Sequence, residues 1–189
     1  MMTKIDTTNW EHFKIGDIFQ KLDLKVTKKD FNKKIDVSET KTAEFSLPLV
    51  NAKHGNNGIM YYGRPCDFES AEMTIDVVQN GAIATGDVYA QPQRTGVLWD
   101  AYLLKPTADI SSEKVLLFLA TVLEKSIKKN FSYDDKCTWK RVKELTIKLP
   151  VNSNHQPDYA YMDMYMQSLE ISLKERLDHL KSLVDVPYY

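Results

Sequence analysis

The sequence contains only two cysteines, Cys66 and Cys137, which are far apart and have no histidine or second cysteine at ligand spacing. This argues against a disulfide framework and against a zinc site, so we expect no metal and a reducing cytoplasm as the compartment. No stretch approaches the ~18 uninterrupted apolar residues of a membrane span, and the first residues have no signal-peptide core. We therefore expect a cytoplasmic protein that does not enter a membrane.

Motifs of catalysis and cofactor binding are also missing. Gly81 and Gly86 flank Ala-Ile-Ala-Thr, but no Lys-Ser/Thr pair follows, and no GxGxxG precedes a helix. Asp185-Val-Pro-Tyr188 only imitates the Asn/Asp-Pro-Pro-aromatic motif of methyltransferases, because it stands at a chain end with no fold around it. The histidines are scattered: His12, His54, His155 and His179. We predict a non-catalytic chain with no cofactor of its own.

No charge of one sign dominates, since the formal net charge is -1, but the charges are unevenly distributed. Residues 21–41 hold seven lysines against four acids, and residues 124–148 hold seven lysines and Arg141 against four acids. The last stretch, residues 158–185, holds six acids against three bases. This pattern predicts a polarised molecule with two basic regions and one acidic helix.

The 189 residues suffice for one domain with an appended element. We assign residues 1–150 to the domain and residues 157–186 to a C-terminal helix. Residues 10–19 read as an opening strand followed by a turn at Gly16-Asp17, and residues 20–42 as a solvated loop or short helix. Residues 47–62 read as two strands around a loop rich in Asn and Gly.

Short strands and one buried helix predict an α+β fold with a curved, mostly antiparallel sheet and packed helices. Five strands are expected between residues 73 and 105: Met73–Val78, Ala82–Thr85, Val88–Ala90, Gly96–Trp99 and Ala101–Lys105. A broad apolar face predicts a helix over residues 113–129, capped by Ser111 or Ser112.

The longest helix is predicted at the C-terminal end, with Asp158 as its N-cap. Its apolar residues recur every three or four positions and are Met162, Met166, Leu169, Leu173, Leu177, Leu180 and Val184. A helix about 40 Å long is hard for this small domain to cover, so we expect a coiled coil with a partner helix. The alternative is an ordinary helix that folds back on its own core.

Two segments carry residues that suit nucleic acid. The loop at residues 51–58 offers amide, lysine and histidine side chains, which bond phosphates or base edges, although an Asn/Gly turn needs no ligand. Residues 131–145 interleave aromatic and basic residues, as surfaces that stack bases and bind phosphates do. The alternative there is that Trp139 and Val142 anchor a short helix while the lysines are solvated.

Four stretches, in this order and spacing, resemble the DNA-specificity subunit of type I restriction-modification systems and the similar type IIB subunits. They are Trp10–Phe19, Leu47–Ile59, Gly81–Tyr89 leading to Ala101–Pro106, and Thr138–Pro150 with Pro157–Met162. The resemblance implies a target recognition domain followed by a spacer helix. Full-length subunits of this family carry two of each, and their helices pair as an antiparallel coiled coil, whereas this chain holds one of each.

The resemblance therefore implies a half-subunit that dimerises through its last helix and binds one half of a bipartite double-stranded DNA site. It also implies docking to a methyltransferase (M) subunit that supplies S-adenosylmethionine, with a restriction (R) subunit as a further partner. The candidate DNA contacts are Asn51, Lys53, His54, Asn56, Asn57, Gln91, Gln93, Arg94, Tyr133, Lys136, Lys140 and Arg141. The alternative function is a protein-interaction or inhibitory module that uses the acidic helix without DNA.

Overall fold

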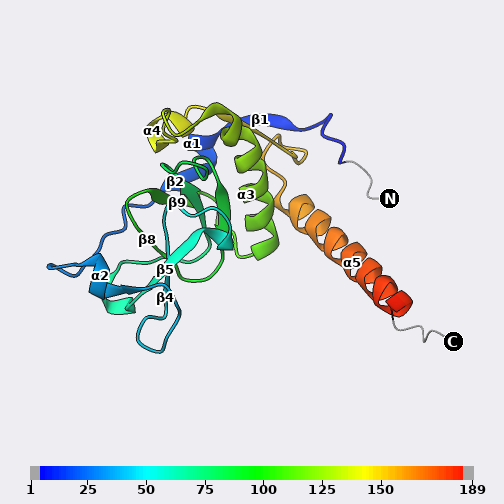
Figure 1. The fold of residues 1–189 in the computed structure, drawn as a ribbon. Helices are drawn as coiled ribbons and strands as arrows, with labels where there is room; N and C mark the ends of the chain where they lie inside the picture. Colours follow the sequence, from blue (N-terminus) through cyan, green and yellow to red (C-terminus); the bar gives the residue numbers. More distant parts are fainter. Residues whose placement is uncertain (1–4, 185–189) are drawn as a thin grey trace.

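The computed structural model describes residues 5–184, except for the side chain of Val184, and consists of a head and one projecting helix (Figure 1). We call residues 5–158 the head. The predicted helix residues 185 and 186 and the predicted contact of Val184 lie outside the described residues. The helix leaves the head at one corner, far from the lobe that contains α2.

The central sheet of the head is antiparallel and has the strand order β2-β9-β6-β7. Its strands are β2 (Phe19–Lys21), β9 (Ala101–Pro106), β6 (Thr74–Val78) and β7 (Val88–Gln91). Side chains alternate between the faces of β6, so Ile75 and Val77 enter the main core beneath α3 (Glu113–Ile127). That helix contributes Leu116, Leu119 and Leu123, all fully buried.

A second sheet forms the lobe next to α2 (Lys33–Asp36), with the order β3-β5-β4-β8. Its strands are β3 (Val37–Ser38), β5 (Ile59–Gly63), β4 (Leu47–Val50) and β8 (Gly96–Val97). The pairing of β4 with β8 is parallel, while the other pairs are antiparallel. A small cluster formed by Val50, Ala101 and Leu103 joins this sheet to the central one.

A two-stranded sheet of β1 (Glu11–Lys14) and β10 (Thr146–Leu149) closes the far side of the main core. The short helices α1 (Ile15–Ile18) and α4 (Trp139–Val142) adjoin it. Three 3₁₀ turns complete the head: η1 (Asn56–Gly58), η2 (Pro65–Asp67) and η3 (Lys128–Asn130). The fold is thus a mixed α/β head with open, mostly antiparallel sheets.

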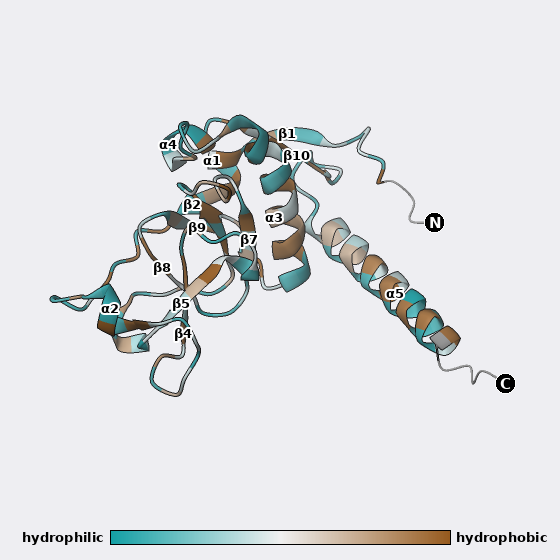
Figure 2. Ribbon diagram, viewed as in Figure 1, coloured by the Kyte–Doolittle hydropathy of each residue, from teal (hydrophilic) through white to brown (hydrophobic). Residues whose placement is uncertain are grey.

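The last helix, α5 (Tyr159–Val184), begins as predicted, because the Asp158 carboxylate accepts a hydrogen bond of 2.9 Å from the Tyr161 N–H. Its first turns pack on α3, where the rings of Tyr165 and Phe118 meet edge to face at 6.2 Å. Beyond Glu170 the helix leaves the head, and apolar residues continue along it (Figure 2). Within residues 5–184, no helix is both long and apolar enough to cross a bilayer.

The structure confirms several predicted elements and corrects others. The strand, loop and strand of residues 47–62 are present, and Ser112 caps α3 by accepting from the Val115 N–H. The predicted strand Ala82–Thr85 is wrong, because these residues form a turn. The opening strand followed by a turn at Gly16-Asp17 is confirmed, because β1 leads into the one-turn helix α1 before β2 begins at Phe19.

Candidate nucleic-acid interface

The loop at residues 51–58 and the segment at residues 91–94 form one surface. The Asn57 side-chain amide donates to the carbonyl of Ala90 at 3.0 Å, and the Gln91 amide donates to the carbonyl of Asn57 at 2.6 Å. The Gln93 amide in turn donates to Gln91 Oε1 at 2.8 Å. Reciprocal hydrogen bonds therefore hold two segments, which are distant in sequence, in a fixed relation.

The backbone of the loop at residues 51–58 takes a conformation that its residue types suit. Asn56 and Asn57 have φ values of 46° and 52°, a region that asparagine tolerates better than most residues. Gly58 has φ +74°, and a Cβ there would lie 2.2 Å from Asp76 Oδ2. Only glycine fits this position, so the loop is locked against β6.

Asp87 is the hydrogen-bonding centre beneath this loop. Its buried carboxylate binds Lys128 Nζ, His54 Nδ1 at 2.6 Å and the Tyr89 hydroxyl at 3.2 Å. Tyr89 also accepts from the Gly55 N–H at 2.8 Å. Burial alone would raise the pKa of Asp87, but the hydrogen bonds from Lys128 and His54 outweigh it and lower that pKa. The Asp87 carboxylate therefore fixes the positions of the Lys128 and His54 side chains beneath the loop.

Asp76 lies on the neighbouring strand β6 and has different surroundings from those of Asp87. Its carboxyl group is fully buried, and within the described residues neither oxygen has a hydrogen-bond partner. Burial, together with the nearby charge of Asp87, raises the pKa of Asp76 well above its usual value. The pKa values of these two neighbouring carboxyl groups are therefore shifted in opposite directions.

The segment at residues 131–141 combines structural and exposed residues. Arg141 binds Asp135, with Nη2 and Oδ2 3.0 Å apart, and stacks on the Phe131 ring at 4.8 Å. Val142 is fully buried and Trp139 is half-buried. These two residues therefore anchor the short helix α4 to the core, as the alternative to a nucleic-acid surface predicts. The predicted contact residues of this segment, Tyr133, Lys136, Lys140 and Arg141, are all exposed.

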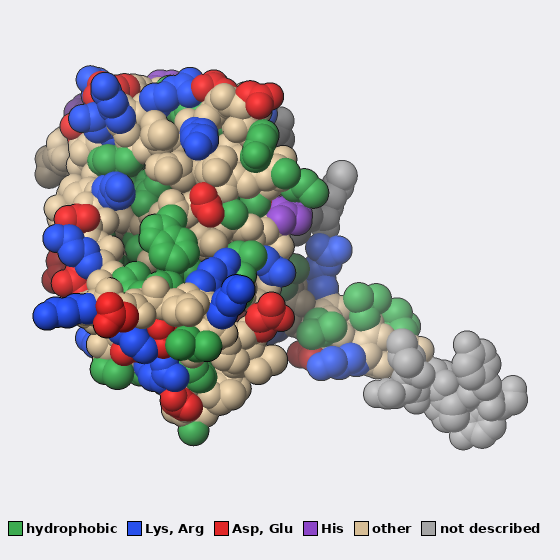
Figure 3. All heavy atoms as spheres, turned by 60° about the vertical axis from the view of Figure 1, so that its left-hand side comes forward, with side chains coloured by type: hydrophobic (Ala, Val, Ile, Leu, Met, Phe, Trp, Pro, Cys, Tyr) green, Lys and Arg blue, Asp and Glu red, His purple; other side chains and the backbone are tan. Residues whose placement is uncertain are grey.

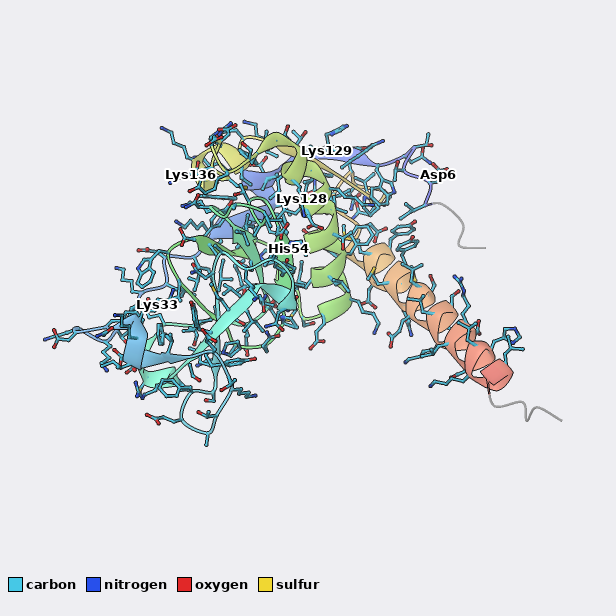
Figure 4. All side chains as sticks on the ribbon, viewed as in Figure 1. Asp6, Lys33, His54, Lys128, Lys129 and Lys136 are labelled. Atoms are coloured by element: carbon cyan, nitrogen blue, oxygen red, sulfur yellow. The ribbon has the colours of Figure 1, made fainter. Side chains whose placement is uncertain are left out.

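Backbone contacts connect these segments into a continuous surface. A Cβ on Gly81 would lie 3.3 Å from Ala52 Cβ, and one on Gly86 would lie 3.2 Å from Lys128 Cα. The Cys137 N–H donates to the Gln79 carbonyl at 3.0 Å. We call residues 51–58, 81–86, 91–94 and 128–140 together the loop surface; Figure 4 shows His54, Lys128, Lys129 and Lys136 on it.

The structure corrects two of the predicted contact residues. Asn51 is buried and accepts from the Asp100 N–H at 2.9 Å, and Gln91 is buried beneath Asn57 and Gln93. Both side chains shape the loops and do not face solvent. The prediction that Met162 contacts a partner helix is also wrong, because Met162 is fully buried in the main core.

The other predicted contact residues stay predictions. Lys53 is half-buried, and His54, Asn56, Asn57, Gln93 and Arg94 are exposed. Within residues 5–184, no ion pair engages Lys53, Arg94, Lys136 or Lys140. Lys128 and Lys129 were missed as loop-surface residues, although their place at the end of a predicted basic helix was a usable signal.

The predicted polarity of the head is weaker than the lysine counts indicate. In residues 21–41, Lys28 binds the buried Asp36, which also pairs with Arg64 at 3.2 Å. On the face of the head that Figure 3 shows, basic and acidic side chains are interspersed. Unlike a uniformly basic face, this arrangement leaves a limited set of cations free to bind phosphates.

The structure thus combines a head that exposes polar loop residues with one projecting helix (Figure 1). A family model described as "Type I restriction modification DNA specificity domain" matches residues 7–181. The chain therefore belongs to the family of type I restriction-modification DNA specificity domains.

Individual relatives agree with this assignment. The "Type II restriction enzyme BgcI specificity subunit S.BcgI" of Heyndrickxia coagulans is 25% identical over 163 residues, which are 86% of this chain and 44% of that protein. The chain thus spans less than half the length of this curated relative.

Solved structures show the same fold. The type I restriction-modification S subunit from M. genitalium superposes with a TM-score of 0.57 at 18% identity, over 94% of this chain and 44% of that one. The HsdS subunit from Thermoanaerobacter tengcongensis gives 0.51 at 15% identity, over 93% and 41%.

Proposed function

We propose that this chain is a half-subunit in which one target recognition domain, the head, reads one half of a bipartite DNA site. The observation that carries the proposal is the outer part of α5, where Leu173, Leu177 and Leu180 are each 52–59% exposed. Two copies of the chain would bury these leucines against each other and bring two heads together.

The exposed leucines of α5 supply a driving force for pairing. Burying the exposed half of a leucine side chain stabilises an interface by on the order of 1 kcal/mol. Leu173, Leu177, Leu180 and Leu183 of each copy are available in the described part of α5. Leu169 and Met166 continue the same stripe toward the head, where they are half-buried. The helix is long enough to hold two heads apart at a fixed spacing.

DNA binding by the head would divide between two kinds of contact. Lys53, Lys136 and Lys140 would neutralise phosphates, which makes affinity fall as salt rises. Arg94 would bond guanine bidentately, while Asn56 and Gln93 would approach adenine or other base edges. Tyr133, Asn57 and His54 border the same surface. Catalysis would belong to a methyltransferase subunit that docks on the chain and supplies S-adenosylmethionine, in the cytoplasm.

The test is selection of duplex DNA from a random library by the chain, alone and with its methyltransferase subunit. We expect enrichment of two inverted copies of one short sequence at a fixed spacing. Arg94→Ala should change or weaken the enriched bases, whereas Arg176→Ala, an exposed arginine on α5, should leave them unchanged. Absence of any enriched sequence, or a single half-site without its inverted copy, contradicts the proposal.

A further inference from the structure

The turn between β6 and β7 presents an apolar side chain in the middle of the loop surface. Ile83 is 78% exposed, more than the other large apolar residues found exposed within residues 5–184. It stands at the tip of the turn Gly81–Gly86, whose neighbours Ala84 and Thr85 are 4% and 7% exposed. The chain thus buries the base of this turn and exposes its most apolar member.

The turn is rigid, so the position of Ile83 is fixed. The Thr85 hydroxyl donates to the Gly81 carbonyl at 2.6 Å and accepts from the Gly81 N–H at 3.0 Å. The Gly86 N–H donates to the Val78 carbonyl at 3.0 Å, and the Asp87 N–H donates to that of Ala84 at 2.8 Å. Hydrogen bonds therefore close the turn on both sides of Ile83. The β-branched side chain adds its own stiffness at χ1.

Segments that carry lysine side chains lie on both sides of the turn. On one side Gly81 packs on Ala52, which leads into the loop with Lys53 and His54. On the other side Gly86 packs on Lys128, which is followed by Lys129 (Figure 4). An apolar tip flanked by Lys53 and Lys129 can contact bases while these lysines bind the neighbouring phosphates.

We infer that Ile83 is a specificity-determining residue that contacts the 5-methyl group of a thymine in the major groove of the target DNA. This inference rests on the proposed function and names one base contact of its recognition surface. The thymine methyl is the apolar group that base pairs present in the major groove, and aliphatic side chains recognise it by contact. A stiff aliphatic side chain on a locked turn loses little conformational entropy when it makes that contact.

The experiment uses the DNA sequence enriched from the random library. Each thymine of that duplex is replaced in turn by deoxyuridine, which removes the methyl group and keeps the base pair. We expect one position per half-site where replacement weakens binding by the wild-type chain about four-fold, the ratio given by one buried methylene. Ile83→Ala should weaken binding to the unmodified duplex several-fold and should no longer respond to deoxyuridine at that position.

Two further variants separate the contact from a change in folding. Ile83→Val keeps a branched aliphatic side chain and should retain the response to deoxyuridine. Ile35→Ala removes an aliphatic side chain of similar exposure, 65%, on α2 and should bind like the wild type. All three variants should melt like the wild type, because both isoleucines are exposed.

The outcomes distinguish this inference from the proposed function. If the library yields no enriched sequence, the proposed function fails. If a sequence is enriched but Ile83→Ala binds it as the wild type does, the inference alone is overturned. It is also overturned if Ile83→Ala weakens binding while no thymine position responds to deoxyuridine, since that result indicates a wedge between bases or a phosphate-side contact.

Discussion

The head and the outer part of α5 contain the same apolar residue in opposite environments. Leu116, Leu119 and Leu123 on α3 have no solvent exposure, whereas Leu173 and Leu177 on α5 are each 52% exposed. The apolar side chains of α3 are therefore buried within the head. Those of α5 are buried only where the helix packs against α3. The comparison teaches that the same residue type is buried where two elements of this chain pack together and exposed where α5 extends beyond them.

The largest expected effect comes from truncating a leucine on the buried side. Leu119→Ala leaves a cavity under the central sheet and should lower the free energy of unfolding by about 2–5 kcal/mol. Leu177→Ala removes the same atoms from α5 and should leave the unfolding of the head unchanged. Urea denaturation followed by tryptophan fluorescence measures both variants. Equal losses of stability in the two variants would contradict the view that leucines stabilise the head on α3 but not on the outer part of α5.

The second effect tests how rigidly the loop surface is built into the head. Gly58→Ala places a Cβ 2.2 Å from Asp76 Oδ2 in a backbone with φ +74°. Strain and overpacking together should lower the stability by about 2–4 kcal/mol. Gly55→Ala is the matched control, because Gly55 has the same φ but nothing lies within 4 Å of its added Cβ. A similar melting temperature for both variants would show that the contact with Asp76 is unimportant.

The third effect depends on pH. The pKa of Asp76 is raised in the folded head, so its contribution to stability is present below the usual carboxyl pKa and is lost as pH rises through the raised value. Asp76→Asn keeps the neutral shape and should stabilise the head increasingly from pH 4 to pH 8. Each unit of raised pKa corresponds to about 1.4 kcal/mol. Melting temperatures across this range would contradict the account if the gain were independent of pH.

The smallest effect belongs to the surface of α5. Lys174 pairs with Glu170 one turn earlier, with Nζ and Oε1 2.8 Å apart, and both side chains are largely exposed. Solvent screens such a pair, so Lys174→Ala should leave both the melting of the head and the association of the chain unchanged. Melting and light scattering test this directly. A clear loss of association in Lys174→Ala would show that the charged face of α5, and not its leucines, makes the contact between two copies.

The sequence pattern was enough to predict those elements that nearby residues determine. The Asp158 and Ser112 caps, the α3 helix and the strands around the loop at residues 51–58 follow from residue types within a few positions. The turn at residues 82–85 was mistaken for a strand, because Ala-Ile-Ala-Thr has strand composition and its real determinant is the bond from Thr85 to Gly81. Composition does not reveal such a bond.

Tertiary contacts account for the misassigned site residues. Asn51 and Gln91 have side chains of the type that bonds base edges. In the structure, Asn51 accepts from the Asp100 N–H and Gln91 donates to the Asn57 carbonyl, so both are used within the protein. Met162 has the spacing of a partner-facing residue, yet α3 lies where that partner would be. Ile83 belongs to no periodic pattern at all. Its exposure on a locked turn is visible only once the turn is placed between Ala52 and Lys128.

The most direct test of the central claim is the mass of the chain in solution, measured by light scattering over a wide range of concentration. Pairing through α5 predicts twice the chain mass of 21.8 kDa, and Leu173→Glu with Leu177→Glu should reduce this to one chain mass without changing the melting of the head. A wild-type chain that stays at 21.8 kDa at the highest concentration would contradict the claim.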